Sequence, residues 1–337
     1  MKIYNDNLDS HHRELVDDVV VILIPVFNDW KALNLLLLAL DKTLRAKDLK
    51  VEVLIVDDAS IISLEKDLEE LSLKSIKKVN ILELRRNLGH QRAITIGLAY
   101  VEENIPCRVV AVMDGDGEDT PEDVLRMLER CKKYNYKKLI FAQRTKRSES
   151  WKFRFFYSIY RQLYRILTGQ VIRFGNFSVV PRRIIGRLVV VSEIWNHYAV
   201  GIMKARIPHV EVPCQRGNRL AGNSTMNFVS LVTHGLSAIS VYGETVGVRL
   251  LVVSLILICL IVIFMLAVVL IRLATPMAIP GWASYMFILL GIVCMEFILL
   301  STFFIFTILS GRNASSFIPK RDYQYFVLSV QQVFPKS

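Results

Sequence analysis

The chain has 337 residues, room for one domain of ordinary size and a further segment, because single domains mostly run about 100 to 200 residues. Hydrophobic residues make up 53%, charged residues 22%, and the mean hydropathy is +0.37, which excludes a disordered or fibrous protein and disfavours an ordinary soluble one. Forty-two Lys and Arg against 31 Asp and Glu give a formal charge of +11, which suits nucleic acid, a phosphate-bearing substrate or an acidic membrane surface.

The first 18 residues are polar and acidic, without a basic segment that leads into an apolar one. No secretory signal is predicted, so residues 1–18 are expected to form a tail and the N-terminal part to stay in the cytosol. The five cysteines are widely spaced and contain no C-x-x-C pair, so neither a disulfide framework nor a zinc site is predicted.

Five apolar, β-branched runs follow, and their ends lie 28 to 31 residues apart, close to the length of one βαβ unit. The runs are 19–27, 51–58, 79–86, 108–115 and 137–144. Near-continuous hydrophobic strands suit a parallel sheet covered on both faces, and Thr120-Pro121-Glu122-Asp123 is typical of a helix start. We predict an α/β fold with an open, mostly parallel sheet, and a ligand beyond the carboxyl ends of its strands.

Polar residues cluster where four of these runs end. They are Asn28-Asp29, Asp57-Asp58, Arg85-Arg86-Asn87 and the segment 114–119, DGDGED. Four acids within six residues would repel one another unless a cation held them, and hard oxygen ligands favour Mg²⁺ or Mn²⁺. A solvated acidic turn that caps the next helix is the alternative, but the strand-end position and the companion acids favour a metal.

Other phosphate-binding motifs fail. No G-x-G-x-x-G opens a helix after a strand, which disfavours a dinucleotide oxidoreductase. The segment 217–224 imitates a P-loop but has Asn223 where the lysine must be, which disfavours an ATPase.

Basic and aromatic residues are interleaved over 144–165. Such a segment could bind nucleic acid, but beside a membrane anchor it is more simply an amphipathic helix at the lipid interface, and 226–247 predicts a second one. We expect no nucleic-acid partner.

Two apolar stretches follow, an uncharged one over 250–271 and one over 282–310 that is interrupted only by Glu296. The first has 22 residues, about 33 Å of helix, enough to cross a hydrocarbon core of about 30 Å. Together they predict a two-pass membrane hairpin. Basic residues flank its open end, so both termini are expected on the cytoplasmic side. For Glu296 a packing role is preferred to a role in transport, because two helices enclose no pathway.

The order and spacing of these pieces resemble the inverting family 2 glycosyltransferases, in the membrane-bound branch of polyprenyl- and dolichol-phosphate sugar synthases. The matching pieces are IPVFND (24–29), VDDAS (56–60), RRNLGHQRAITIGL (85–98), MDGDGEDTPED (113–123), RGNRLAGNSTMNF (216–228) and the hairpin. The sequence departs from the family pattern at three places. It has Asp29 where the family often has Glu, Ala59 where it often has Gly, and Gly117-Glu118 where Leu-Gln is common.

The resemblance implies a nucleotide-sugar-binding sheet of the GT-A type and transfer of one sugar, with inversion, to a polyprenyl phosphate at the cytosolic face of a cell membrane. It implies a metal, Mg²⁺ or Mn²⁺, on Asp114, Asp116 and Glu118, with Asp116 catalytic. The implied nucleotide-binding residues are Pro25, Asn28, Asp57, Asp58, Asn87, Gly89, His90 and Asp114. The implied division is a tail (1–18), a catalytic domain (19–225), an interfacial helix (226–247), a hairpin (248–311) and a cytosolic tail (312–337).

The acceptor decides whether a catalytic base is needed. A sugar hydroxyl must lose a proton, whereas a lipid phosphate with a second pKa of about 6 is already mostly dianionic at neutral pH and needs cations to position it. Arg216 and Arg219 are the candidates, and attraction to lipid headgroups is their other explanation. Glu193 and His197 lie where relatives that act on hydroxyls carry a base; a surface Glu and a packed His are the plainer interpretation.

Two alternatives stay open. One is a transferase that extends a polysaccharide or glycosylates another lipid, although QLYRI (162–166) lacks the Trp of the processive motif Q-x-x-R-W. The other is a non-catalytic nucleotide-binding scaffold. The oligomeric state is also open: the segment 323–334 looks like a strand that could pair with another subunit in a homo-oligomer.

Overall fold

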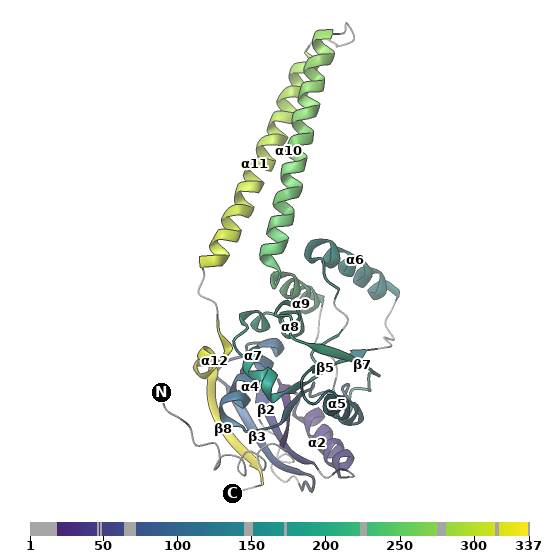
Figure 1. The fold of residues 1–337 in the computed structure, drawn as a ribbon, viewed down its shortest axis with the longest axis vertical. Coiled ribbons are helices and arrows are strands. Elements are labelled where there is room, and N and C mark those ends of the chain that lie inside the picture. Colours follow the sequence, from purple (N-terminus) through teal and green to yellow (C-terminus); the bar gives the residue numbers. More distant parts are fainter. Residues whose placement is uncertain are drawn as a thin grey trace. The chain divides into compact units, whose positions relative to one another are not determined.

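The computed structural model describes residues 19–45, 47, 49–63, 72–144, 151–171, 174–222, 228–274, 281–313 and 317–335 (Figure 1). The predicted tail 1–18 lies outside them. The described residues form two compact units. The first contains the sheet with its helices, and the second contains the end of α6 from Tyr157 and the two longest helices.

The first unit is built on a mixed sheet with the strand order β7-β5-β6-β4-β1-β2-β3-β8. The five predicted strands are all present, as β1 (Val19–Val26), β2 (Lys50–Asp57), β3 (Ile76–Leu84), β4 (Val109–Val112) and β5 (Leu139–Arg144). Strands β4, β1, β2 and β3 run parallel, as does β5 with β7 (His209–Cys214). The short strand β6 (Ser178–Pro181) is antiparallel to both neighbours and separates β4 from β5.

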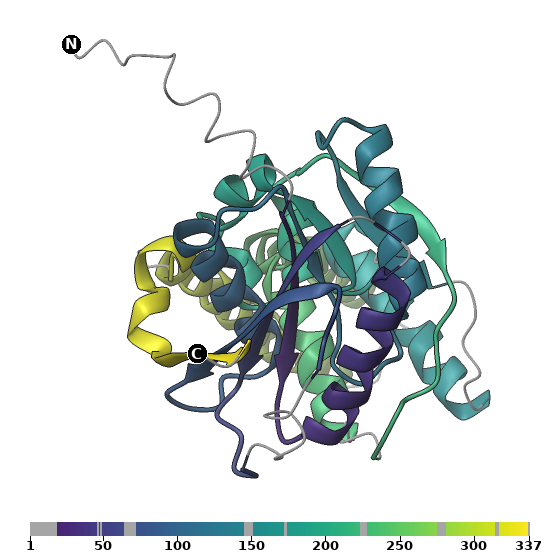
Figure 2. The ribbon, with the colours of Figure 1, turned by 90° about the horizontal axis from the view of Figure 1, so that it is seen from below.

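Helices cover both faces of this sheet (Figures 1 and 2). On one face Val20, Ile22 and Ile24 of β1 pack with α2 (Trp30–Leu44) and α5 (Pro121–Lys133). On the other face Val21 and Leu23 pack with helices α4 (His90–Asn104), α7 (Arg182–Leu188) and α8 (Tyr198–Lys204). Successive side chains of a strand point to opposite faces, so a strand buried on both sides must be apolar throughout.

Helix α4 approaches the sheet at Gly97. A Cβ added there would lie 2.7 Å from both Leu23 Cδ1 and Val56 Cγ2, closer than packed carbons allow. We expect Gly97→Ala to lower the free energy of unfolding by about 1 to 3 kcal/mol through overpacking. Gly186 in α7 is the control, because its nearest neighbour would be Glu102 Oε1 at 3.7 Å. Thermal unfolding in detergent should show a loss for Gly97→Ala and none for Gly186→Ala; equal losses would contradict this packing.

The C-terminal segment belongs to the first unit. After α12 (Pro319–Asp322) and the 3₁₀ turn η2 (Tyr323–Phe326), strand β8 (Val327–Phe334) pairs antiparallel with β3 and forms one edge of the sheet (Figure 2, yellow). The strand expected over 323–334 is therefore present over 327–334 only, after the 3₁₀ turn, and its partner in this structure is β3 of the same chain. Trp195 stacks on Phe317 with ring centres 3.8 Å apart, which fixes the start of this segment.

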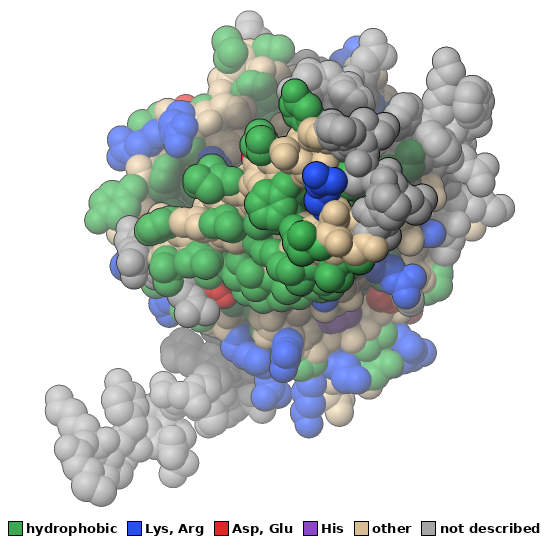
Figure 3. All heavy atoms as spheres, turned by 90° about the horizontal axis from the view of Figure 1, so that it is seen from above, with side chains coloured by type: hydrophobic (Ala, Val, Ile, Leu, Met, Phe, Trp, Pro, Cys, Tyr) green, Lys and Arg blue, Asp and Glu red, His purple; other side chains and the backbone are tan. Residues whose placement is uncertain are grey.

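The second unit holds α10 (Gly243–Ala274) and α11 (Trp282–Asn313), both long and apolar enough to cross a membrane. Figure 3 looks onto their free end, where hydrophobic side chains dominate the surface. Helix α6 (Trp151–Thr168) ends in this unit, where Arg249 Nη1 donates to the Ile166 carbonyl at 2.6 Å. The side chains of residues 144–157 lie outside the described part. Of the aromatic residues of the predicted amphipathic segment, Tyr160 and Tyr164 are described, with ring centres 6.1 Å apart, and Tyr164 is buried.

Candidate active site

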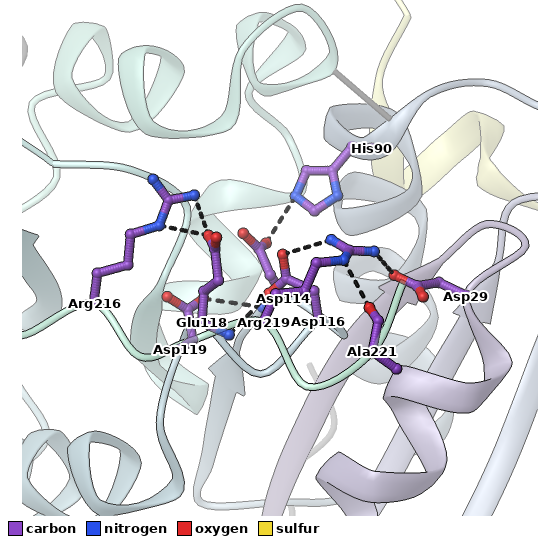
Figure 4. A network of polar contacts seen from close by, with 9 residues as sticks. All are labelled: Asp29, His90, Asp114, Asp116, Glu118, Asp119, Arg216, Arg219 and Ala221. Atoms are coloured by element: carbon purple, nitrogen blue, oxygen red, sulfur yellow. Dashed lines mark hydrogen bonds and ion pairs between the residues drawn. The ribbon is translucent and has the colours of Figure 1, made fainter. Parts of the chain in front are cut away.

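The acidic segment 114–119 forms a tight turn at the end of β4 (Figure 4). Asp119 is buried and accepts a hydrogen bond from the Asp114 amide at 3.0 Å, while Asp116 Oδ1 accepts one from the Glu118 amide at 3.0 Å. Gly117 has φ +85°, which a residue with a side chain rarely adopts. Thr120 caps α5 as predicted, with its Oγ1 accepting from the Asp123 amide at 3.3 Å. The turn therefore presents Asp114 and Asp116 while Asp119 holds its shape.

The segment 216–222 lies along this turn. The Gly217 amide donates to the Glu118 carbonyl at 2.8 Å and the Leu220 amide to the Asp116 carbonyl at 2.9 Å. A Cβ on Gly117 would collide with the Leu220 side chain, so the two segments are in van der Waals contact. Residues about a hundred positions apart in the sequence are thus joined through their backbones.

Both predicted arginines reach the acidic turn (Figure 4). Arg219 donates to Asp116 Oδ2 at 3.1 Å, to Asp29 Oδ2, and to the Ala221 carbonyl at 2.9 Å. Arg216 donates through Nε to Glu118 Oε2 at 2.6 Å. Side-chain exposures of 22% for Arg219 and 38% for Arg216 leave both guanidinium groups within reach of solvent or a ligand. The pKa of Asp116 is raised, chiefly by burial and also by its acidic neighbours, and Arg219 opposes this.

His90 opens α4 and contacts the other side of the turn, with Nε2 3.1 Å from Asp114 Oδ1. Burial lowers the pKa of His90, but the Asp114 carboxylate, assisted by Asp119 and Asp116, gives a net rise. The buried Asp58 carboxylate fixes this helix start, because it accepts from the Leu88 amide at 2.7 Å and the Gly89 amide at 2.8 Å. The pKa of Asp58 is raised by burial, which these bonds partly offset.

The predicted residues at the ends of β1 and β2 are also largely engaged with the chain itself. Asn28 Oδ1 accepts from the amides of Ile61 at 2.8 Å and Ile62 at 3.0 Å, and Asp57 Oδ1 accepts from the Ser60 amide at 2.9 Å. Burial raises the pKa of Asp57. Pro25 is buried within β1 and Asn87 is exposed. Asn28, Asp57 and Asp58 thus shape the strand-end loops, and their contact with a nucleotide stays a prediction.

This geometry can be compared with known proteins. The model of glycosyl transferase family 2 matches residues 21–195, more than half of the chain. The chain belongs to glycosyl transferase family 2. It is thus a glycosyltransferase, and the alternative of a non-catalytic scaffold finds no support.

Among the relatives of this glycosyltransferase is the uncharacterized glycosyltransferase YkcC of Bacillus subtilis, 27% identical over 229 residues, or 66% of this chain and 68% of that protein. The undecaprenyl-phosphate 4-deoxy-4-formamido-L-arabinose transferase of Proteus mirabilis is 28% identical over 133 residues, but this match covers only 39% of either protein. The glucosyl-3-phosphoglycerate synthase of Mycobacterium tuberculosis, solved with Mn²⁺, UDP and phosphoglyceric acid, is 12% identical with a TM-score of 0.50. Its structure covers 70% of this chain and 82% of its own, which shows that the fold is shared.

The two candidate bases of the glycosyltransferase are engaged elsewhere. Glu193, in the 3₁₀ turn η1 (Ser192–Trp195), pairs with Lys204 Nζ at 3.0 Å and accepts from Ser192 at 3.1 Å. Burial raises its pKa, but Lys204 and the hydrogen bonds lower it below the ordinary value. His197 is 4% exposed, and its Nδ1 accepts from the Val200 amide at 3.4 Å at the start of α8. Glu193 is thus ion-paired with Lys204, and His197 is buried at a helix start.

The buried His197 makes stability depend on pH. Burial, with a contribution from His234, lowers its pKa from about 6.5 to about 3. The unfolded chain then binds more protons than the folded one between these values, so the free energy of unfolding should fall as the pH drops below about 6.5. His197→Asn keeps a capping acceptor and removes the titration. Thermal unfolding at pH 7 and pH 5 should show a smaller loss for the variant; an unchanged loss would contradict this role of His197.

One further residue at this site, His234, carries no recognisable signal in the sequence. His234, on α9 (Phe228–Ser240), stacks against His197 with ring centres 4.6 Å apart. His90 and Asp114 both act on it electrostatically. The pKa of His234 is lowered by burial and by His90, and Asp114 partly offsets this. Helix α9 and the acidic turn are far apart in the sequence and meet only in the fold. His234, a single histidine in an apolar helix, therefore could not be identified as a site residue from the sequence.

The residues present fit a divalent cation that is shared with a substrate. In the described part of the chain no three acidic, His or Cys side chains are grouped so as to hold a metal. Asp114 and Asp116 nevertheless offer two carboxylates from one turn, with side chains 30% and 18% exposed. Mg²⁺ usually binds through one or two carboxylates plus substrate phosphates, and this pair is consistent in number and type with such a site. Glu118 faces Arg216 instead, and its predicted place in the metal shell stays a prediction.

Proposed function

We propose that this glycosyltransferase moves one sugar, with inversion, from a nucleotide-sugar donor to a polyprenyl phosphate. The observation that carries the proposal is the placement of Arg216 and Arg219 on the acidic turn, combined with the engagement of Glu193 and His197 in other contacts. This site supplies cations for an anionic acceptor and no free base in the SEIWNHY segment for a neutral one. A phosphate monoester needs none, because its second pKa is about 6.

Asp114 and Asp116 would hold Mg²⁺ or Mn²⁺ against the donor diphosphate. When bound, the ion neutralises charge on the departing nucleoside diphosphate. Both carboxylates now contact cationic or polar side chains, His90 for Asp114 and Arg219 for Asp116. Arg219 would therefore leave Asp116 as the donor complex binds, and its guanidinium would become available to orient the acceptor phosphate bidentately.

The acceptor is a lipid, so the reaction would take place at a membrane. We propose that α10 and α11 span the bilayer, with the catalytic unit and both termini in the cytoplasm, as the flanking basic residues predict. Helix α9 would lie at the interface. It buries Ala238 and exposes Val232 and Leu236, which are 44% and 59% exposed.

The test is an acceptor comparison in detergent micelles. A panel of nucleotide sugars with Mn²⁺ is offered to a polyprenyl phosphate and, as matched control, to the polyprenol of the same length, and the lipid products are weighed. The proposal predicts a mass increase of one sugar on the phosphate and none on the alcohol. Transfer to the alcohol, or a ladder of products from a growing polymer, would contradict it.

A further inference from the structure

Glu296 is the only charged residue between 282 and 310, and it lies near the middle of α11. Its side chain is exposed, on the side of the helix turned away from α10. Ser301, by contrast, is 7% exposed and faces α10. The exposed neighbours of Glu296 lie one and two turns away on the same side, and we call this set the Glu296 face: Leu289, Ile292, Glu296, Leu299 and Phe303.

The described part of the hairpin offers this carboxyl group no charged partner at its depth. Residues 250–271 of α10 contain no charged side chain, and Arg272 lies beyond them at the end of the helix. A carboxyl group at the centre of a bilayer is costly against lipid and almost always faces protein or a water-filled cavity. Leu289, Ile292, Leu299 and Phe303 are 54% to 63% exposed and apolar, so they line no aqueous path. We therefore expect the Glu296 face to contact a protein partner that has one polar group at the same depth in the membrane as Glu296.

We propose that the Glu296 face packs against the same face of a second copy of this chain. This inference rests on the membrane placement proposed above. A second copy inserted in the same direction puts its own Glu296 at the same depth, and the rest of its face is equally apolar. A protonated carboxyl group both donates and accepts a hydrogen bond, so two such groups satisfy each other across a two-fold axis. An isologous contact of this kind needs no cation from another protein.

Cysteine cross-linking in native membranes tests the face directly. With Cys259 and Cys294 replaced by alanine, Phe303→Cys places a thiol on the Glu296 face, seven residues from Glu296, and Ile298→Cys places one on the opposite flank. The two positions are 63% and 47% exposed, so both thiols are accessible. We expect oxidation to give a covalent dimer for Phe303→Cys at least about tenfold more than for Ile298→Cys. Equal yields, or no dimer in membrane-embedded protein, would overturn the inference.

Substitution of Glu296 in the Phe303→Cys background separates the carboxyl group from its apolar neighbours. Glu296→Gln keeps a donor and an acceptor and should retain the dimer, whereas Glu296→Leu should lower its yield several-fold. Donor hydrolysis or sugar transfer by Glu296→Leu shows that the chain is folded, since Glu296 is not part of the catalytic site. Protein that remains soluble after cell lysis would contradict the membrane placement, a result distinct from membrane-bound protein without the cross-link. A dimer unaffected by Glu296→Leu would contradict the role of the carboxyl group.

Discussion

Asp116→Asn is expected to lower kcat about 100- to 1000-fold, the loss typical when one electrostatic partner of the transition state is removed. The asparagine keeps Oδ1, which accepts the hydrogen bond from the Glu118 amide, so the turn should keep its conformation. It removes the charge that would hold the metal on the departing diphosphate. Initial rates at saturating donor and Mn²⁺, with thermal unfolding as a check on folding, provide the measurement.

The control for this variant is Glu122→Gln. Glu122 is an exposed acid in the first turn of α5, six residues along the same segment, and its Oε1 accepts only a weak hydrogen bond from Thr43 at 3.3 Å. It should keep its rate within about twofold, as surface substitutions usually do. If Asp116→Asn turned over as fast as Glu122→Gln, the acidic turn would not be the catalytic centre.

Arg219→Ala is expected to lower kcat/KM for the polyprenyl phosphate about 100-fold and to leave the KM of the donor within a few-fold. Truncating one side of a hydrogen-bonded charge pair typically costs at least about 2 kcal/mol, and Arg219 donates to Asp116, one of the two carboxylates proposed to hold the metal. Arg219→Lys should recover part of the lost kcat/KM, because lysine keeps the positive charge but cannot form two parallel hydrogen bonds as a guanidinium group does. Initial rates over a range of acceptor concentrations give the comparison.

A second readout separates this role from a structural one. Removal of Arg219 takes a cation from Asp116, so Mn²⁺ should bind at least as tightly to the variant as to the native chain. The control is Arg183→Ala, an exposed arginine on α7 away from the turn, which should change neither quantity. Weaker Mn²⁺ binding together with an unchanged acceptor KM would show that Arg219 supports the turn rather than the acceptor.

The parallel half of the sheet could be predicted because its strands carry a strong local signal. A strand buried on both faces must be apolar without interruption, as in Val19–Val26, and the polar residues that follow then mark the ligand edge. The four-residue β6 carries no such signal, and its insertion between β4 and β5 depends on tertiary packing. A strand was expected over 323–334, but its pairing with β3 was not, because pairing partners distant in sequence leave no trace in a single chain.

The residues of the candidate site could be predicted from their type and position in the sequence. The contacts that they make with one another were harder to predict. Asp58, predicted to contact a nucleotide, also accepts hydrogen bonds from the amides of Leu88 and Gly89, a role that depends on backbone geometry. Arg219 was expected on an acceptor phosphate and in the free protein bridges Asp29 and Asp116. Charged side chains that folding brings together also pair with one another, and these contacts cannot be predicted from residue type alone.

Manganese binding in the presence of a nucleoside diphosphate tests the central claim most directly. Electron paramagnetic resonance would count the Mn²⁺ bound by the native chain and by the double variant Asp114→Asn, Asp116→Asn, with the diphosphate of whichever donor supports transfer. The account predicts one ion per chain in the native protein and affinity at least about tenfold weaker in the double variant. Equal binding by both proteins, or full turnover in a chelator that removes all divalent metal, would contradict it.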